Sequence, residues 1–166
     1  VHRWPVTNAN SIGGIALHDD GTLFRSVSAL NGGVERIAFD GTVTWSYSSQ
    51  PGLNVHHDIE VMPNGNILLI AEESWSLEQA ISEGRNPSGV FSSFKTDAII
   101  EVQPTGPTTG TIVWEWHVRD HLIQDFDPTK QNFGVVADAP ERIDVNYPIS
   151  MPFGEFNHVN GIDYDP

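Results

Sequence analysis

Imidazole and amide side chains recur in two similar segments of the chain. One segment, HHDIEVMPNGN, covers residues 56–66, and the other, NHVNGIDYDP, covers residues 157–166. Aligning their prolines sets His57 on Asn160, with His158 two residues before Asn160. Residues two apart in a β-strand share a face, so His158 and Asn160 are expected on one face. Imidazole and amide N–H groups suit an oxyanion such as sulfate or phosphate, which makes these three side chains candidates for binding and catalysis.

The neighbours of His57 admit a structural interpretation as well. In a regular strand His57 shares a face with Ile59, while His56 and Asp58 point to the opposite face. We expect Asp58 to anchor a loop. The competing interpretation is that His57 and His158 have no role in chemistry and only form hydrogen bonds with backbone groups that line a central channel of the fold.

Composition and charge narrow the class of partner. The chain has 166 residues, of which 39% are hydrophobic, which is enough for one globular domain. Its net charge of -14 repels nucleic acid and anionic membranes, so neither is an expected partner. The sequence contains no cysteine, which excludes disulfides and thiolate chemistry. No apolar run approaches the ~20 residues that a membrane-spanning helix needs.

Sequence motifs for metals and cofactors are incomplete or missing. Asp125 and Asp127 have a spacing found in calcium loops, but the glycine and the closing glutamate of an EF-hand are missing. His117 and His121 are four residues apart without the HExxH pattern of a zinc site. The sequence has no Walker loop, dinucleotide fingerprint or nucleophilic serine motif. We therefore expect neither a metal nor a cofactor.

An internal repeat indicates the elements that carry the candidate residues. GGIALHDDGT at 13–22 aligns with HDIEVMPNGN at 57–66, and GTVTWSY at 41–47 aligns with GTIVWEW at 110–116. Each repeat has four short strands, with Asp-Gly or Asn-Gly in two-residue hairpin turns. Repeated four-stranded antiparallel sheets predict an all-β fold of the β-propeller class. A β-sandwich with accidental similarity is the alternative.

The predicted blades have definite places in the sequence. We expect one partial propeller domain over 1–166, with about two and a half blades. Its parts are blade 1 at about 11–47, blade 2 at about 55–116 with an insertion at 72–97, a loop insertion at 117–156, and the first strand of blade 3 at 157–166. Trp45 and Trp114 are expected to pack between blades, and Ser74 is expected to cap a short helix. Because a ring needs four to eight blades, we expect further chain or other copies to complete it.

Three stretches of the sequence resemble one known family. HHDIEVMPNGNILLIA, the insertion WHVRDHLIQDFDPTKQNFGVVADAPERIDVNYP and the segment EFNHVNGIDYDP resemble the bacterial arylsulfotransferases. That family has a six-bladed propeller and transfers a sulfuryl group from a phenolic sulfate to a phenol through a histidine intermediate, without PAPS. The resemblance implies that His158 and His57 are catalytic and that Asn160 binds substrate beside His158. It also implies that the nucleophilic histidine lies in a later blade, outside residues 1–166. Arg119 stands where an aromatic residue is usual in the family. It is a candidate anion-binding charge, and the alternative, which the sequence favours, is a surface arginine in a loop.

The resemblance leads to one function and leaves one alternative. We expect an arylsulfotransferase-like propeller that is periplasmic or secreted, acts on phenolic sulfates and phenols, and is inactive as this stretch alone. The alternative is a non-catalytic extracellular propeller that serves as a scaffold for a ligand or partner. Further blades with histidine and arginine on their innermost strands would favour the enzyme.

Overall fold

The computed structural model describes most of the chain as two compact units. The first unit comprises Val1–Glu72, Ile99–Glu115 and Val159–Pro166, and the second comprises Glu73–Ala98 and Trp116–His158. The described residues are 2–4, 13–27, 32–89, 93–148 and 154–165. Within these ranges, no helix has the length and apolar character that crossing a membrane requires.

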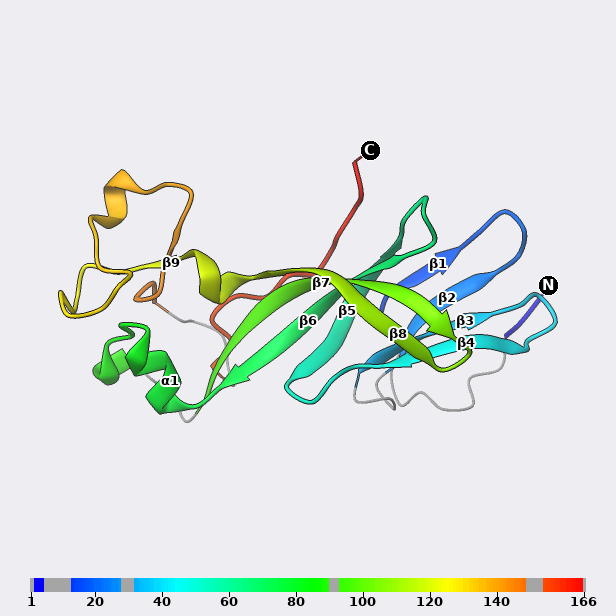
Figure 1. Ribbon diagram of the computed structural model, residues 1–166, viewed down its shortest axis with the longest axis horizontal. Coiled ribbons are helices and arrows are strands. Elements are labelled where there is room, and N and C mark those ends of the chain that lie inside the picture. Colours follow the sequence, from blue (N-terminus) through cyan, green and yellow to red (C-terminus); the bar gives the residue numbers. More distant parts are fainter. Residues whose placement is uncertain (1, 5–12, 28–31, 90–92, 149–153, 166) are drawn as a thin grey trace. The chain divides into compact units, whose positions relative to one another are not determined.

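Among the described residues, two four-stranded antiparallel sheets form most of the β-structure (Figure 1). The first has the order β1-β2-β3-β4, with strands at Ile15–Leu17, Leu23–Val27, Gly33–Ile37 and Val43–Ser48. The second has the order β5-β6-β7-β8, with strands at Leu53–Val61, Ile67–Trp75, Phe94–Gly106 and Thr109–His117. The prediction of an all-β chain built from such sheets is confirmed, and each sheet is compatible with a propeller blade. Two sheets are fewer than any closed ring contains, so the ring and its number of blades stay predictions.

The hairpin turns differ in length from the prediction. In the first, the His18 N–H donates to Thr22 O at 2.9 Å and the Gly21 N–H donates to His18 O at 2.9 Å, which leaves three residues in the loop. Gly21 has φ of 82°, and Gly41 and Gly65 repeat this conformation at 90° and 84°. A type I turn followed by a left-handed glycine builds such a loop, so only the glycine needs positive φ. The aspartate or asparagine before each glycine accepts a backbone N–H two residues further on instead.

The two sheets pack face to face within the first unit. Their shared core consists of buried aliphatic and aromatic side chains from both sheets: Phe24, Val34, Trp45, Tyr47, Val55, Ile59, Ile67, Leu69, Ile100 and Val102. Trp45 is 1% exposed, and its indole N–H donates to Thr109 O at 2.9 Å. Trp45 therefore packs between the sheets as predicted, and burying its ring contributes strongly to the core.

Replacing Tyr47 by phenylalanine is expected to stabilise the chain. The Tyr47 hydroxyl is buried and has no hydrogen-bond partner among the described residues. Its removal should raise the free energy of unfolding by about 1 kcal/mol, measured by urea denaturation at neutral pH. Burial also raises the pKa of Tyr47 above 10.0. The unfolded chain then loses this proton first, so wild-type stability should fall above about pH 10 and the gain from Tyr47→Phe should grow there. If Tyr47→Phe were less stable than the wild type both at neutral pH and above about pH 10, the hydroxyl would have a hydrogen-bond partner.

The second unit corrects the boundaries of the first predicted insertion. Strand β6 continues to Trp75 and β7 begins at Phe94, so residues at both ends of the predicted 72–97 insertion belong to the sheet. The predicted short helix is present as α1 at Leu77–Ser82, but Ser76 caps it and Ser74 does not. The capping box explains this choice, because the Ser76 side chain accepts the Gln79 N–H while the Gln79 side chain accepts the Ser76 N–H. Ser74 lies within β6.

The 117–156 insertion is ordered by short elements and by one buried arginine. It contains the parallel pair β9 (Leu122–Ile123) and β10 (Ile143–Asp144), with 3-10 turns at Val118–His121 and Val136–Asp138. A further 3-10 turn at Pro87–Gly89 follows α1. Arg85 is 4% exposed and donates from Nη1 to Tyr147 O at 2.9 Å and from Nη2 to Gly89 O at 2.9 Å. Because a buried guanidinium needs such acceptors, Arg85 ties the α1 region to the insertion.

The predicted strand at 157–166 is wrong for the described residues 157–165. The structure assigns no strand there. A strand is defined by a ladder of hydrogen bonds with a neighbour. Just before the segment, Lys95 and Glu155 form one isolated parallel bridge, and within it the Ile162 N–H donates to Asp58 Oδ2 at 3.3 Å. These separate contacts hold the segment without the continuous ladder that a strand requires.

Candidate functional site

His57 has an unusual backbone conformation in the middle of β5. Its φ is 51°, and it is the one non-glycine residue with positive φ among the described residues. The left-handed region costs an ordinary residue roughly 1–2 kcal/mol, so surrounding contacts must stabilise it. Val55 and Ile59 are buried on either side, whereas His57 is exposed. The prediction that His57 shares a face with Ile59 is therefore wrong, because the left-handed turn interrupts the alternation and directs the imidazole to solvent.

Gly14, just before β1, and Ser26 of β2 hold the His57 backbone in place. The Gly14 N–H donates to His57 O, and the Ser26 hydroxyl donates to the same oxygen at 3.3 Å. Ser26 Oγ also accepts the Gly13 N–H at 3.1 Å. A Cβ atom on Gly14 would lie 2.6 Å from Ile59 N, so only glycine permits this approach of the two backbones. The strained histidine is thus fixed by a contact between the two sheets, which is a common arrangement at functional positions.

Asp58 connects β5 with the last described segment of the first unit. Its Oδ2 accepts the Ile162 N–H at 3.3 Å and its Oδ1 accepts the Ile59 N–H at 3.0 Å. The expectation that Asp58 anchors a loop is confirmed. Asn160, a predicted binding residue, lies two positions before Ile162 and belongs to the same unit as His57. Asp58 therefore positions the backbone that carries Asn160.

His158 lies in the second unit beside an acidic residue. The Phe156 N–H donates to Lys95 O at 2.8 Å, and Asn157 Oδ1 accepts the Asp97 N–H at 3.1 Å. These bonds place residues 155–157 beside the start of β7. The Nδ1 atom of His158 lies 3.6 Å from Glu155 Oε2, a contact that becomes an ion pair when the imidazole is protonated. The side chain is 24% exposed, so a ligand can reach it.

A second histidine and Arg119 share a buried carboxylate in this unit. Glu73, near the end of β6, has a side chain that is 8% exposed. Its Oε2 lies 3.0 Å from His117 Nδ1 and its Oε1 lies 3.1 Å from Arg119 Nη1. Arg119 Nε is also 3.8 Å from Asp120 Oδ1. The charge of Arg119 is therefore already compensated, although 47% of its side chain is exposed.

Replacing Glu73 by glutamine should destabilise the chain. A neutral amide cannot form an ion pair with Arg119, and because the Arg119 side chain is 47% exposed, the loss should lie between the costs of a surface pair and a buried pair, at about 1–2 kcal/mol. Asp120→Asn is the matched control, because Asp120 is 63% exposed and exposed pairs contribute well under about 1 kcal/mol. Urea denaturation of the two variants measures the difference. Equal stabilities would mean that the Glu73 pairs contribute no more than a surface contact.

The four predicted site residues divide evenly between the two units. His57 and Asn160 belong to the first unit, and His158 and Arg119 belong to the second. Sequence reasoning missed the partnership of Glu73 with Arg119, because residue 73 was assigned to an insertion. The buried run ILLIA before Glu72 could have extended the predicted strand far enough to reveal it.

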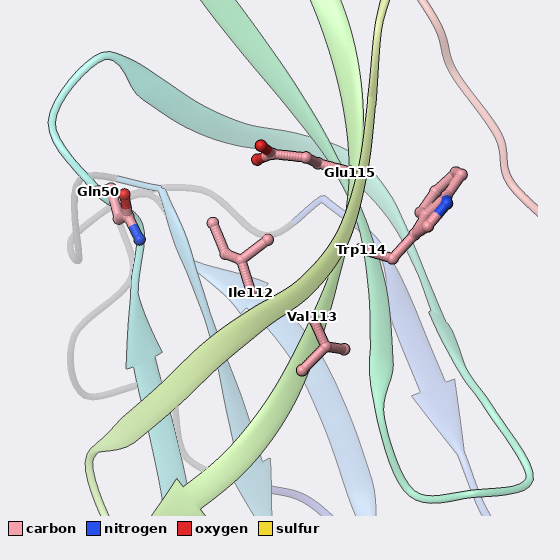
Figure 2. Close-up of a pocket in the computed structure, with 5 residues that line it drawn as sticks. All are labelled: Gln50, Ile112, Val113, Trp114 and Glu115. Atoms are coloured by element: carbon pink, nitrogen blue, oxygen red, sulfur yellow. The ribbon is translucent and has the colours of Figure 1, made fainter.

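The first unit also contains a surface hollow, which Figure 2 shows. Its volume is about 350 Å³, and it lies between Gln50, two residues after the end of β4, and the outer strand β8. The lining residues are Gln50, Ile112, Val113, Trp114 and Glu115. None of the four candidate site residues lines it. This hollow is therefore distinct from the positions that could bind an oxyanion.

The candidate side chains are of types that can bind an anion. The accessible imidazoles of His57 and His158 can donate N–H groups to an oxyanion or exchange protons with it, and the Asn160 amide can donate as well. Positioned donors of this kind stabilise negative charge that develops during group transfer. Hydrogen bonds to its carbonyl oxygen fix the His57 backbone, and bonds at residues 156 and 157 fix the chain just before His158, which favours such positioning.

Comparison with known proteins identifies the family. A family model described as Arylsulfotransferase (ASST) matches residues 1–166, which is the whole chain. No curated protein matches the sequence. The family match covers both sheets and all four predicted site residues. The chain therefore belongs to the arylsulfotransferase (ASST) family.

Proposed function

We propose that the chain contributes to a site that transfers a sulfuryl group from a phenolic sulfate ester to a phenol. The observation that carries this proposal is the family match over residues 1–166. The backbone conformation of His57 supports it, because a strained and exposed histidine is more typical of a functional position than of a packing one. Membership of the family implies phenolic substrates in general, but it does not identify the individual donor and acceptor.

The proposed reaction has two steps that pass through a histidine intermediate. A neutral imidazole nitrogen attacks the sulfur, and the bond from sulfur to the phenolic oxygen breaks with its electron pair remaining on that oxygen. The departing phenolate takes up a proton. The oxygen of the acceptor phenol then attacks the same sulfur, the bond from sulfur to nitrogen breaks, and the acceptor proton passes to a base. Both steps spread negative charge over three sulfuryl oxygens.

The four candidate residues have distinct proposed roles in this reaction. His158 and His57 would donate to the sulfuryl oxygens or transfer the proton, and Asn160 would donate its amide N–H. Arg119 would add positive charge near the anion, although it shares its guanidinium with Glu73. The histidine that forms the covalent intermediate is proposed to lie outside these residues.

The proposal also covers the architecture of the complete protein and the compartment in which it acts. We infer that the two sheets are consecutive blades of a closed propeller of six blades, with the candidate residues near its axis. Family members of this kind are typically periplasmic or secreted, and we infer the same for this chain. The stretch of 166 residues alone is expected to be inactive.

An assay of the complete gene product tests the function. It is incubated with 4-nitrophenyl sulfate and phenol, and both 4-nitrophenolate and phenyl sulfate are quantified. The proposal requires that, over many turnovers, the two products form in equal amounts and that turnover beyond the first depends on phenol. Release of 4-nitrophenolate with free sulfate would indicate a hydrolase, and no release at all would also contradict the proposal.

A further inference from the structure

The candidate binding residue Asn160 is followed directly by a glycine. The sequence contains three such Asn-Gly pairs, at residues 31–32, 64–65 and 160–161, and the structure describes both members of the last two. Asparagine is thermolabile because the next backbone nitrogen attacks its side-chain carbonyl carbon and displaces the amide. A glycine promotes this attack, since it has no side chain to shield its nitrogen and its backbone is permissive. The fold then decides which pair reacts, because the two atoms must be free to meet.

The pair Asn64–Gly65 is held away from the geometry of attack. It lies in the turn between β5 and β6, where the Gly65 N–H donates to Met62 O at 2.9 Å. The Asn64 side chain is also restrained, because its Oδ1 accepts the Asn66 N–H at 2.9 Å and its Nδ2 donates to Glu101 Oε1 at 3.4 Å. The attacking nitrogen and the carbon that it must reach are both fixed, so we expect this amide to persist.

The pair Asn160–Gly161 is in a less restrained setting. Both residues are exposed, and they lie in the segment 157–165, to which the structure assigns no helix or strand. Among the described residues, none accepts the Gly161 N–H. The bond from the Ile162 N–H to Asp58 Oδ2 at 3.3 Å holds the chain only after the reacting pair. The Gly161 nitrogen can therefore approach the side chain before it without breaking a ladder of hydrogen bonds.

We propose that Asn160–Gly161 is a site of spontaneous deamidation. The Gly161 nitrogen forms a bond to the side-chain carbonyl carbon of Asn160, and the bond from that carbon to the amide nitrogen breaks. The amide nitrogen leaves as ammonia, with the proton that the Gly161 nitrogen has lost as its third hydrogen. Water then opens the cyclic imide at either of its carbonyl groups, which leaves aspartate or isoaspartate at position 160.

This conversion would switch off the proposed site as the protein ages. An amide N–H donor becomes a carboxylate, which only accepts hydrogen bonds and repels the oxygens of a sulfuryl group. Isoaspartate also lengthens the backbone by one carbon, which displaces its neighbours. The deamidation itself rests on the Asn-Gly pair and its surroundings, whereas its effect on turnover rests on the proposed function.

Peptide mapping of the complete gene product tests the conversion. The protein is aged in mildly alkaline buffer, which accelerates removal of the Gly161 proton, and mass spectrometry measures the change from amide to acid at Asn160 and Asn64. Asn160 should react faster by on the order of tenfold or more, because the fold restrains only the other pair. In urea the two pairs should react at similar rates. Equal rates in the folded protein, or no conversion at Asn160, would overturn the proposal.

Gly161→Ala is the matched variant. A Cβ atom at position 161 would contact only Asp58 Oδ2, at 3.7 Å, and Gly161 does not have positive φ, so alanine fits without strain. The added methyl group hinders attack by the backbone nitrogen, and the Asn160 amide should therefore survive the same ageing. Conversion in Gly161→Ala as fast as in the wild type would contradict attack by this nitrogen.

The effect on turnover is measured on the same samples with 4-nitrophenyl sulfate and phenol. Aged wild type should lose activity in proportion to the acid formed at position 160, whereas aged Gly161→Ala should retain it. Asn160→Asp should reproduce the loss without ageing, by about 10²-fold in kcat/KM. Wild-type turnover in Asn160→Asp would overturn the switching-off. Absence of transfer in the fresh wild type would instead contradict the proposed function, and the peptide map would still decide the deamidation.

Discussion

Replacing His158 by alanine in the complete gene product should lower kcat/KM for sulfuryl transfer by about 10²–10³-fold. This is the usual cost of removing one positioned donor to an oxyanion. The His158 imidazole lies beside Glu155 and is reached by solvent, so its loss removes the donor without opening the core. Initial rates with 4-nitrophenyl sulfate and phenol measure the effect.

Two further variants separate catalysis from folding. His158→Gln retains an N–H donor and should recover part of the lost rate, which a purely structural role would not produce. His2→Ala is the matched control, because His2 stacks on Phe39 at 4.0 Å, away from the candidate residues in the sequence, and its rate should equal that of the wild type. Wild-type turnover in His158→Ala would remove His158 from the proposed site.

Replacing His57 by glycine should lower activity as much as replacing it by alanine does, but should cost less stability. Glycine adopts positive φ at little cost, whereas alanine does not, so His57→Gly should unfold about 1 kcal/mol less readily than His57→Ala. Both variants lack the imidazole and should lose about 10²-fold in kcat/KM. Urea denaturation and initial rates on the same preparations give both values. Full activity in His57→Gly would show that the histidine serves only to form the turn.

The repeat let the sequence predict most of the β-structure. Turn glycines such as Gly21 and Gly65, flanked by alternating apolar residues, indicate hairpins through local chemistry alone. The match of Trp45 with Trp114 extended this to whole sheets, and the packing of Trp45 confirmed that neighbouring sheets stack. These features depend on short-range sequence, and so they can be read without the structure.

The backbone conformation and the partners of the candidate residues could not be predicted from the sequence, because they depend on contacts between residues far apart in the chain. No local signal marks His57 as left-handed, because Gly14 and Ser26, about 30 or more residues earlier in the chain, stabilise that conformation. The pairing of Glu73 with Arg119 joins residues far apart in the chain. The segment at 157–165 reads as a strand because its residues alternate, yet strand formation requires a partner that residue pattern cannot supply.

The most direct test of sulfuryl transfer through a histidine is a rapid-quench experiment without acceptor. The complete gene product is mixed with excess 4-nitrophenyl sulfate alone, and both 4-nitrophenolate and the mass of its peptides are recorded. The account predicts a burst of about one 4-nitrophenolate per protein, with one sulfuryl group added to a histidine peptide and removed when phenol is supplied. His158→Ala should slow that burst by the same factor as turnover. Steady turnover with phenol but no burst and no modified histidine would contradict the account.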